Sequence, residues 1–395
     1  MKVALVIETS GGGSGRHVID LADGLIRLGA EVHVVYSRLR KESAGFVTEL
    51  ENLPGVRVQP LDMRRSPHIS DIGAIRRLRA YIESNGGFDV LHGHSSKAGA
   101  VARFAAIGTK IGAVIYTPHA FRTMDPYLGK FERLVYGSIE RVLGNFLTDL
   151  LIAVSEDERQ HAISLGIRAE VIRTILNGVA LPRRIERGLA RDSLGIGDDE
   201  VCVGFVGRFV EQKAPELLID AFGAVAADFP KSKVVMVGSG ELEGSIRARI
   251  SRHHLERRVT ILTGLKGQDV MPAFDVLVMP SRYEAMPYVL LEAVSFGVPI
   301  IVTEVGGAST VVHDGENGFV VRRDDPAAIA EKLRILIESI ETRERMRRAA
   351  LQIREQFSLD AMISRTVDAY ESALRAPQRR VGAIAAVQGC CVHGH

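Results

Sequence analysis

The fold is indicated first by residues 280–299, which read Pro280-Ser-Arg-Tyr-Glu-Ala-Met-Pro-Tyr-Val-Leu-Leu-Glu-Ala-Val-Ser-Phe-Gly-Val-Pro299. The apolar, partly β-branched run that precedes it, residues 276–279, is typical of a buried strand. Pro287 suits the first turn of a helix, where its missing N–H costs no hydrogen bond. Residues 288–296 therefore predict a helix that ends at Gly297, and residues 298–303 predict the next strand. This strand–loop–helix–strand pattern indicates a parallel sheet covered by helices.

Two acids stand inside this stretch, Glu284 and Glu292, with seven residues between them. Glu284 falls in the loop ahead of the predicted helix and Glu292 well inside it, so the two carboxylates are not expected to share one proton. The N–H groups from Ala285 to Val289 point out of the helix start, where a phosphate binds readily. A sugar–diphosphate–ribose ligand fits this layout, with one acid for the hydroxyl groups at each end. Two acids alone would more often be a surface glutamate and an ordinary helix glutamate.

The surrounding residues favour the binding interpretation. Pro287 lies between the two acids, Gly297-Val-Pro299 follows them, and the pair Gly306-Gly307 comes next. This pattern resembles the retaining glycosyltransferases of family 4, which have the GT-B fold, and the resemblance recurs across nearly the whole chain. There are two departures: Ala285 stands where the family often has glycine, and Thr310 stands where an acid commonly follows the glycine pair.

Length and composition fit this resemblance. The chain has 395 residues, of which 46% are hydrophobic and 25% charged, enough for two domains with full cores. A net charge of only +2 provides no bulk field for nucleic acid, so no nucleic-acid partner is expected. Cys202, Cys390 and Cys391 offer neither a disulfide framework nor metal-ligand spacing, as in cytosolic proteins. Residues 1–7 are too short a run for a signal peptide, and we expect a cytoplasmic protein.

Strand and helix patterns alternate through both halves of the chain, which predicts an α/β protein with two doubly wound, Rossmann-like domains. The resemblance implies that these domains face each other across a cleft and that the C-terminal helix crosses back to the first domain. The expected parts are an acceptor-binding domain at 1–182, a linker at 183–200, a nucleotide-sugar-binding domain at 201–357, a returning helix at 358–375 and a disordered tail at 376–395.

The first domain opens with a strand, a glycine-rich turn at 9–15 and a helix from Arg16. This opening is typical of dinucleotide-binding folds. The next strand is followed by Ser37 and Arg38 rather than by the acid that holds a ribose, so the case for a nicotinamide site is weak. The resemblance implies instead that Gly12 and Gly13 let the backbone approach the donor phosphate and the acceptor hydroxyl, whereas a plain tight turn remains the alternative.

Ligands of parallel sheets lie beyond the carboxyl ends of the strands, so the residues that follow each strand matter most. His119 directly follows the predicted strand 113–117, where the family often has a histidine facing the donor sugar. His92 and His94 follow another strand, and they are equally well explained as structural residues lining the cleft. We assign Arg16, His92, His94 and His119 to the acceptor side of the site.

The second domain begins with the predicted strand 201–206 and a loop that carries Arg208 and Lys213. Both cations could reach one diphosphate, lysine as a point charge and arginine as a fork. The resemblance gives them that role and places the nucleobase near Leu265. The residues expected to bind the donor are Gly12, Gly13, Arg208, Lys213, Leu265, Glu284, Ala285, Met286, Pro287, Tyr288, Val289 and Glu292, and those expected to act in catalysis are His119, Glu284, Arg208 and Lys213.

The expected reaction is transfer of a sugar from a nucleotide-diphosphate sugar, UDP ahead of GDP, to a hydroxyl of a saccharide or lipid-linked saccharide. No Asp-x-Asp triplet occurs, which agrees with a site that needs neither a metal ion nor another cofactor. Glu284 would bind sugar hydroxyls and Glu292 the ribose. No obvious nucleophile is available, so the acceptor would attack on the leaving group's side with retention. The rivals are a nucleotide-sugar epimerase of the same twin-domain fold and a nicotinamide-dependent enzyme.

Residues 127–145 predict a long amphipathic helix that bears Lys130, Arg133 and Arg141 beside apolar side chains. A solvated face is the ordinary explanation of such a pattern. Helices of this kind also rest on anionic lipid, so peripheral contact with the inner face of the membrane is a further hypothesis.

Overall fold

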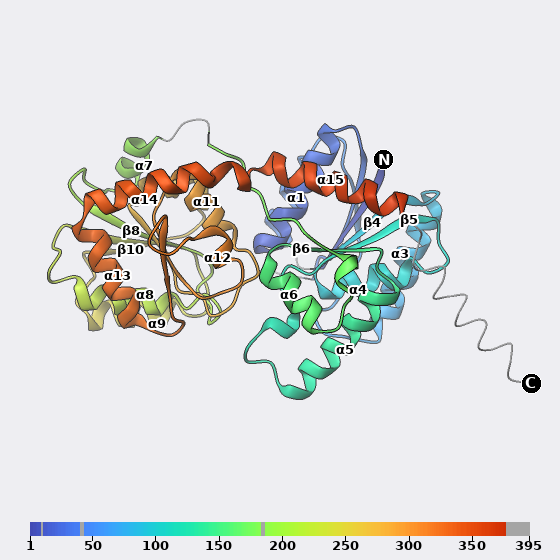
Figure 1. Cartoon of the computed structure of the whole chain (residues 1–395), viewed down its shortest axis with the longest axis horizontal. Helices are drawn as coiled ribbons and strands as arrows, with labels where there is room; N and C mark the ends of the chain where they lie inside the picture. Colours follow the sequence, from blue (N-terminus) through green and yellow to red (C-terminus); the bar gives the residue numbers. More distant parts are fainter. Residues whose placement is uncertain (9–10, 40–42, 183–185, 377–395) are drawn as a thin grey trace, which may run out of the picture. The chain divides into compact units, whose positions relative to one another are not determined.

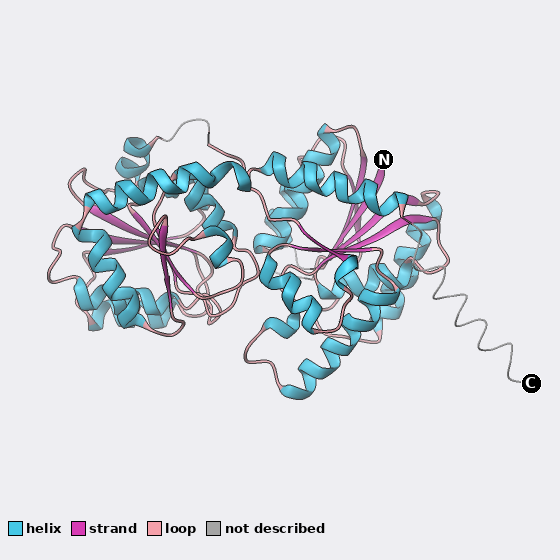
Figure 2. Ribbon diagram, viewed as in Figure 1, coloured by secondary structure: helices cyan, strands magenta, loops and turns pink. Residues whose placement is uncertain are grey.

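The structure is a computed structural model that describes residues 1–8, 11–39, 43–182 and 186–376. The chain divides into two compact units, Met1–Asn177 together with the residues from Asp360 onward, and Gly178–Leu359. The predicted tail, 376–395, lies outside the described residues except for Ala376. Each unit is a parallel sheet with helices on both faces, as expected (Figures 1 and 2).

The first unit contains a seven-stranded sheet in the order β3-β2-β1-β4-β5-β6-β7. Its strands are β1 (Lys2–Ile7), β2 (Glu31–Tyr36), β3 (Arg57–Pro60), β4 (Phe88–His94), β5 (Ile111–Thr117), β6 (Leu150–Ala153) and β7 (Ile172–Thr174). Its helices are α1 (Gly12–Arg27), α2 (Ser43–Glu51), α3 (Ser70–Ser84), α4 (Ser96–Ala105), η1 (Arg122–Met124), α5 (Lys130–Phe146), α6 (Glu156–Ser164), η2 (Ala169–Val171) and α15 (Leu359–Arg375). Buried Val, Leu, Ile and Ala side chains of the strands, α3 and α4 form the core on one face of this sheet.

The second unit contains a six-stranded sheet in the order β10-β9-β8-β11-β12-β13. Its strands are β8 (Val201–Val206), β9 (Ser232–Val237), β10 (Val259–Leu262), β11 (Val276–Met279), β12 (Ile300–Thr303) and β13 (Gly318–Val321). Its helices are α7 (Arg187–Ser193), α8 (Pro215–Val225), α9 (Glu243–Arg252), α10 (Gly267–Val270), η3 (Met271–Ala273), α11 (Tyr288–Phe296), α12 (Ala308–Val311), α13 (Pro326–Glu338), α14 (Ile340–Ile353) and η4 (Arg354–Phe357). Helices α8, α9 and α13 cover one face of the sheet, and α11 and α14 cover the other (Figure 1).

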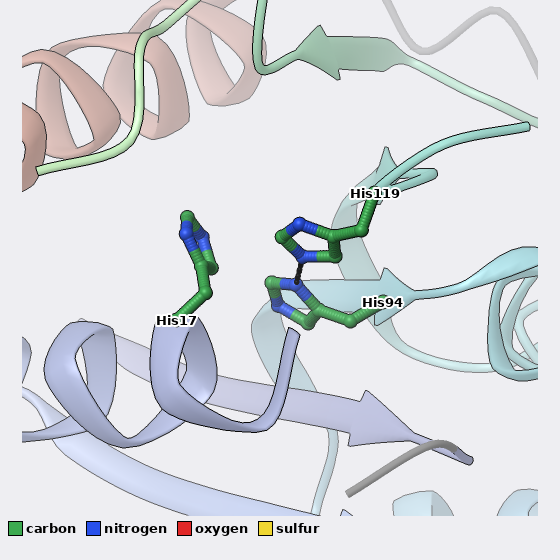
Figure 3. A group of neighbouring side chains, drawn as sticks. All are labelled: His17, His94 and His119. Atoms are coloured by element: carbon green, nitrogen blue, oxygen red, sulfur yellow. Dashed lines mark hydrogen bonds between the residues drawn. The ribbon is translucent and has the colours of Figure 1, made fainter. Parts of the chain in front are cut away.

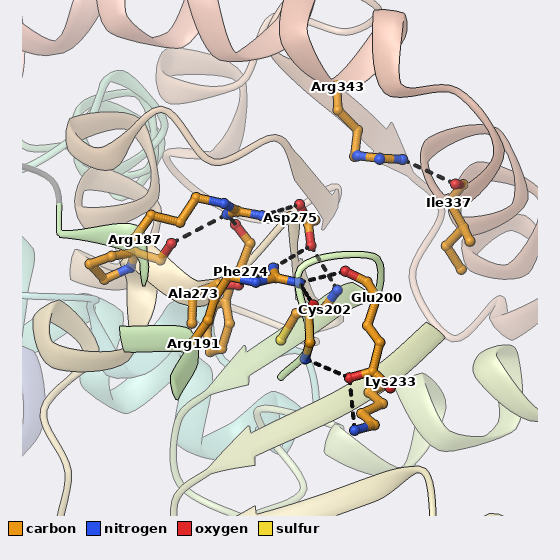
Figure 4. A network of polar contacts seen from close by, with 12 residues as sticks. Arg187, Arg191, Glu200, Cys202, Lys233, Ala273, Phe274, Asp275, Ile337 and Arg343 are labelled. Atoms are coloured by element: carbon orange, nitrogen blue, oxygen red, sulfur yellow. Dashed lines mark hydrogen bonds and ion pairs between the residues drawn. The ribbon is translucent and has the colours of Figure 1, made fainter. Parts of the chain in front are cut away.

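Within the stretch assigned to a linker, residues 187–193 form α7, which a buried arginine fastens to the second sheet (Figure 4). Arg191, only 3% exposed, donates hydrogen bonds to the carboxylate of Asp275 and to the carbonyl oxygen of Ala273. The same carboxylate accepts a hydrogen bond from the backbone N–H of Cys202 at the start of β8. A buried arginine needs partners for its donors, and these contacts explain why residues 187–193 of this polar stretch form a helix against the second sheet.

Helix α15 packs on the first sheet, so the prediction of a helix returning to the first domain is confirmed. Gly24 of α1 makes room for it, because a Cβ there would overlap the side chain of Ile363. Deeper in the helix, the Tyr370 hydroxyl is hydrogen bonded to Nδ1 of His92 at 2.7 Å. Both residues are fully buried, which makes this polar contact part of the core of the unit.

The variant Tyr370→Phe should lower the free energy of unfolding by about 1–3 kcal/mol, because it leaves a buried ring nitrogen of His92 without its partner. Urea unfolding followed by circular dichroism measures the change. Tyr127→Phe is the matched control, since Tyr127 is 60% exposed and an exposed substitution should stay within about 0.5 kcal/mol. Equal stability of both variants would show that the hydroxyl does not hold α15.

Candidate functional site

Each sheet has one point where the strand order reverses, and the candidate residues gather at those points. In the first unit the reversal falls between β1 and β4, and in the second between β8 and β11. Loops that leave two such neighbouring strands run to opposite faces of the sheet, and ligands of open α/β sheets bind in the crevice that results. Arg208 and Lys213 follow β8, while Glu284 follows β11.

The central contact of the second unit is an ion pair between two residues that were expected to bind different parts of the donor. Nζ of Lys213 lies 2.5 Å from Oε1 of Glu284, with side-chain exposures of 17% and 9%. A charge-assisted bond in such a poorly solvated place is stronger than one at the surface. A ligand that enters here meets a cation and a hydrogen-bond acceptor that are already fixed side by side.

The two loops that carry this pair are bound to each other by other hydrogen bonds. The amide of Gln212 donates to the carbonyl oxygen of Tyr283 at 3.0 Å, and the backbone N–H of Arg282 donates to the carbonyl oxygen of Gln212 at 2.8 Å. The guanidinium of Arg282 adds ion pairs with Glu216 and Asp324 at 3.1 and 2.7 Å. The position of the ion pair therefore follows from the backbone of both loops.

Arg208 differs from its neighbour Lys213. Its side chain is exposed, and it makes no hydrogen bond or ion pair with any residue that the structure describes. A guanidinium in this state has all its donors available for an incoming anion, and the fork geometry suits a phosphate.

The start of α11 is where a phosphate site was expected. Pro287 is the N-cap with φ −74°, one position before the first helical residue, and no side chain caps the helix. The first turn contains no acid, so the partial positive charge of the helix start is not neutralised locally. At the other end Gly297 adopts the left-handed conformation with φ 71°, as predicted.

Gly306 and Gly307 pack closely against the loop that carries Glu284. A Cβ at Gly306 would overlap the carbonyl oxygen of Glu284, and a Cβ at Gly307 would overlap that of Ala285. Gly307 also has φ +73°, which a larger residue would adopt only with strain. Ala285 and Met286 are both buried beneath this contact. The pair thus fixes the backbone just ahead of α11.

Glu292 lies on α11 and is only 6% exposed. Its carboxylate reaches the first residue of α10, because a Cβ at Gly267 would overlap Oε2 of Glu292. Leu265, expected near the nucleobase, stands in the same loop after β10 and is 43% exposed. The structure therefore brings Glu292 and Leu265 to one loop, and Gly267 is a contact that the sequence did not single out.

In the first unit, α1 begins at Gly12 rather than at Arg16, with Gly11 as its N-cap. Gly12 has φ +70° and a Cβ there would meet nothing within 4 Å, so the glycine is required by its conformation and not by space. Arg16 lies 3.4 Å from Asp20 one turn along the helix. Burial raises the pKa of Asp20 to about 6, although the charge of Arg16 opposes the rise.

Three histidines meet at the reversal of the first sheet (Figure 3). His17 belongs to α1, His94 ends β4 and His119 follows β5, and one ring nitrogen from each lies within 4.8 Å of the others. His94 and His119 had been expected at this place, whereas His17 had not. Its only signal is a polar side chain on the apolar face of a helix, next to the glycine turn.

His92 stands behind this cluster. It is fully buried, with its ring 4.0 Å from that of His94, and its two ring nitrogens are hydrogen bonded to Tyr370 and to Thr117. Burial and the nearby charge of His17 hold the pKa of His92 well below its usual value. A ring with both nitrogens engaged supports its neighbour and has no nitrogen left for a ligand.

His119 and Ala120 both have positive φ, 53° and 79°. Glu158 of α6 holds this strained turn, because its carboxylate accepts hydrogen bonds from the N–H of Ala120 at 2.7 Å and of Val154 at 2.8 Å. Glu158 is fully buried, and burial raises its pKa to about 7 despite the two donors. Its sequence context, three residues after a helix-capping serine, indicated nothing beyond a helix start.

A cavity of about 540 Å³ adjoins the histidines in the first unit. Glu8, Ser95 and His119 line it at the strand ends, and Phe104, Tyr136 and Ile139 line it from α4 and α5. Lys97 adds a cation that is paired with Asp71 in the wall. The cavity offers polar groups at one side and an apolar wall at the other, which suits a ligand with a hydroxylated part and a hydrocarbon part.

Replacing Glu158 by glutamine should change how stability depends on pH. The folded-state pKa of about 7 exceeds the usual 4.5, so the folded chain binds more protons between these values. The contribution of this carboxyl to stability is therefore full below about pH 4.5 and is lost as the pH rises through about 7, by up to about 3 kcal/mol. Glutamine does not titrate. As the pH rises from about 4.5 to about 7, the unfolding free energy of Glu158→Gln should therefore increase relative to that of the wild type by this amount.

Chemical unfolding of both proteins across this pH range measures the difference. Glu170→Gln, at a side chain that is 59% exposed, is the control and should show no such trend. A difference between Glu158→Gln and wild type that stays constant with pH would contradict the buried, proton-binding carboxyl.

Two family descriptions match the chain. Residues 11–183 match the description Glycosyltransferase Family 4, and residues 186–353 match the description Glycosyl transferases group 1. The boundary between the two matches falls close to the boundary between the two units. Among the described residues, no helix is long and apolar enough to cross a membrane.

Several known proteins are similar to this chain. An uncharacterized 41.2 kDa protein in the cps region of Klebsiella pneumoniae is 33% identical over 255 residues, 62% of this chain and 68% of that protein. The UDP-Gal:alpha-D-GlcNAc-diphosphoundecaprenol alpha-1,3-galactosyltransferase of Escherichia coli is 30% identical over 246 residues, 60% of this chain and 63% of the enzyme. The crystal structure of Anabaena HepE in complex with UDP and glucose has a TM-score of 0.81 and 21% identity, and the match covers 94% of this chain and 100% of that one.

The likeness to the HepE structure agrees with the two Rossmann-like units and confirms the fold class expected from the sequence. The two family matches together extend over most of the described residues. The chain belongs to the glycosyltransferases of family 4, with the GT-B fold.

Proposed function

We propose that the protein transfers a sugar from a nucleotide-diphosphate sugar to a hydroxyl group of a saccharide acceptor, with retention at the anomeric carbon. The observation that carries the proposal is the Lys213–Glu284 ion pair beside the uncapped start of α11. Within one small site, this pair offers positive charge for a diphosphate and a hydrogen-bond acceptor for the hydroxyl groups of a sugar. The names of two similar proteins support a UDP-sugar as donor, since one is a UDP-Gal transferase and the other binds UDP and glucose.

The leaving diphosphate gathers negative charge as the sugar becomes cation-like. Lys213, the exposed Arg208 and the start of α11 supply fixed positive charge to that group. On donor binding Lys213 exchanges part of its contact with Glu284 for a phosphate oxygen, and the freed carboxylate oxygen accepts a hydroxyl of the sugar. These protein groups provide the charge stabilisation, and the proposed transfer therefore requires no metal ion.

The state of Glu284 supports the retaining course. Its carboxylate is engaged with an ammonium group, which lowers its readiness to attack the anomeric carbon. The acceptor hydroxyl would instead attack on the side from which the diphosphate leaves, where the departing phosphate oxygen takes its proton. His119, held in its turn by Glu158, would contact the donor sugar at this stage.

The other end of the donor would lie at α10. Glu292 would accept the ribose hydroxyls, and the backbone near Leu265 would meet the base. Gly267 has a clear role in this proposal, because any side chain there would displace the carboxylate of Glu292. Gly12 and Gly13 would allow the first unit's backbone to approach the donor, next to Arg16 on the same helix.

The acceptor would bind in the cavity of the first unit, with its saccharide part at Glu8, Ser95 and His119. The apolar wall formed by α4 and α5 supports a lipid-linked saccharide, as in the name of the Escherichia coli relative. Exposed apolar side chains continue along α5 beyond the cavity: Phe131, Leu134, Val135, Val142 and Phe146. We propose that this face rests on the cytoplasmic side of a membrane that holds the acceptor.

The direct test is incubation with a panel of nucleotide sugars and candidate acceptors, with and without a chelator, followed by mass spectrometry. The proposal predicts release of the nucleoside diphosphate together with a glycosylated acceptor, and the chelator should leave both unchanged. NMR of the product should show the same anomeric configuration as in the donor. Conversion of the donor to an epimer without an acceptor would identify the rival epimerase instead. Turnover that depends on nicotinamide cofactors would identify the other rival.

Lys213→Ala should remove about 2–4 kcal/mol of transition-state stabilisation, because a preorganised cation at the developing charge is lost. Turnover should fall further than donor affinity, as expected for a contact that strengthens in the transition state. Steady-state kinetics with varied donor separates the two quantities. Lys231→Ala is the control, since its side chain is 71% exposed and, within the described part of the chain, pairs with the surface acid Asp199. Near wild-type turnover of Lys213→Ala would exclude Lys213 from the site.

The two acids should respond differently to substitution. Glu284→Gln should cut turnover strongly, because this residue contacts the reacting sugar and also orients Lys213. Glu292→Gln should chiefly weaken donor binding, by about tenfold to a hundredfold, because the ribose does not change in the reaction. Donor titration and single-turnover rates measure both effects. Loss of turnover with intact donor affinity in Glu292→Gln would contradict this division of roles.

Membrane contact through α5 predicts flotation with anionic liposomes at low salt and weaker recovery at high salt, because exposed Lys130 and Arg141 flank the apolar face. Arg133 contributes less, since its guanidinium donates to the carbonyl oxygens of Thr123 and Asp125. The double variant Phe131→Ser, Leu134→Ser should lose flotation, whereas Leu189→Ser, at an equally exposed apolar residue of α7, should not. Equal recovery with neutral and anionic vesicles would count against electrostatic docking.

A further inference from the structure

The three histidines of the first unit form a nitrogen-rich cluster, and the proposed sugar transfer explains only part of it. His17, His94 and His119 come from three different elements, yet one nitrogen from each lies within 4.8 Å of the other two (Figure 3). His17 and His94 are buried, and His119 is partly exposed on the side of the cavity. The cluster is thus enclosed except toward the space where a small ligand can enter.

The spacing of these nitrogens is near that of a metal site. Tetrahedral Zn²⁺ with bonds of about 2.0–2.1 Å to imidazole places its ligands about 3.3–3.4 Å apart. Nδ1 of His94 and Nε2 of His119 lie 3.0 Å apart and share one proton, which an ion would displace to the solvent, and the three ligand atoms all lie within 4.8 Å of one another. Small rotations of side chains would close the set around an ion.

One hydrogen bond orients His17 for metal binding. A neutral imidazole binds a metal ion through its unprotonated ring nitrogen. Asn177 Oδ1, 3.1 Å from Nδ1 of His17, accepts its proton and leaves Nε2 unprotonated.

A second observation concerns Nε2 of His94, the ring nitrogen other than the one bonded to His119. It is buried and has no hydrogen-bond partner among the residues that the structure describes, so the ring offers a second ligand atom. A buried polar nitrogen without a partner is costly, and it is seldom left so without a reason. His92 stacks behind this ring at 4.0 Å and is itself fixed by Tyr370 and Thr117, so the His94 ring cannot easily turn away.

We propose that His17, His94 and His119 bind a Zn²⁺-class ion through one nitrogen each, with a fourth position open toward the cavity, and that the bound ion inhibits sugar transfer. Three protein nitrogens with an open position are typical of zinc sites that take up an additional ligand. The inhibition rests on the proposed function, because an ion that holds His119 withdraws it from the donor sugar. Binding of the ion itself requires no assumption about the reaction.

The test begins with metal binding, without reference to activity. The C-terminal stretch contains Cys390, Cys391, His393 and His395, whose thiols and imidazoles take up Zn²⁺ even without the spacing of a structural metal site. The full chain with these four residues replaced by serine or glutamine therefore serves as the reference protein. Titration with Zn²⁺ and with Co²⁺ should give one ion per chain, and the Co²⁺ form should show the visible absorption of tetrahedral coordination by nitrogen. Absence of binding to this reference protein would overturn the proposal.

Variants then locate the ion. His17→Gln, His94→Gln and His119→Gln should each weaken binding more than Asn177→Ala, which acts only through His17 and should cost about tenfold to a hundredfold in affinity. The control is His313→Gln, at a histidine that is 48% exposed in the second unit. Circular dichroism verifies that each variant is folded. If the His94 variant fails to fold, His17→Gln and Asn177→Ala decide, and unchanged affinity in both would overturn the assignment.

Activity is measured last, with the nucleotide-sugar substrates. Zn²⁺ should inhibit the reference protein at the concentration that fills the site, and His17→Gln should require more Zn²⁺ for the same fractional inhibition of its own activity. Binding without inhibition would overturn the regulatory role while the metal site stands. Absence of any transfer before zinc is added would instead count against the proposed function, so the two failures are distinguishable.

Discussion

The candidate site of the second unit is built around one ion pair, Lys213 with Glu284, whose residues follow two adjacent strands of the sheet. Their loops are fastened by Gln212 and Arg282, and the backbone beneath Glu284 is fixed by the close approach of Gly306 and Gly307. Fixing a cation and an acid in advance costs folding energy but spares reorganisation when charge develops on a ligand. This arrangement explains why the glycine pair and the acid motif occur together in the sequence.

In the first unit, buried polar groups hold the candidate site residues in place. Its site residues stand on turns of unfavourable backbone conformation, His119 and Ala120 among them, and Glu158 holds these turns at the cost of a buried carboxylate. The histidines are kept neutral by the same burial, and α15 adds Tyr370 to fix the innermost of them. The C-terminal helix is therefore part of the support of this site, although it is distant from it in the sequence.

Local pattern predicted most strands and helices. The buried strands, the helix behind Pro287 and its end at Gly297 follow from periodicity and from proline and glycine positions, whereas the return of the last helix to the first domain followed from the family resemblance. Contacts over long sequence separations did not follow. Lys213 and Glu284 are 71 residues apart, and nothing in either loop indicates that they touch. His17 and Glu158 were missed for the same reason, and α7 was missed because it depends on the distant partners of Arg187 and Arg191.

In the proposed function, the diphosphate of the donor binds where β8 and β11 end, at Lys213, Arg208 and the start of α11. Hydrogen exchange of the full chain with and without UDP tests this binding site, because bound phosphate slows exchange of the N–H groups that it contacts. We expect protection in residues 207–214 and 284–289, with a smaller effect near Gly267. Protection confined to the glycine turn and the histidines of the first unit, with the second unit unchanged, would contradict it.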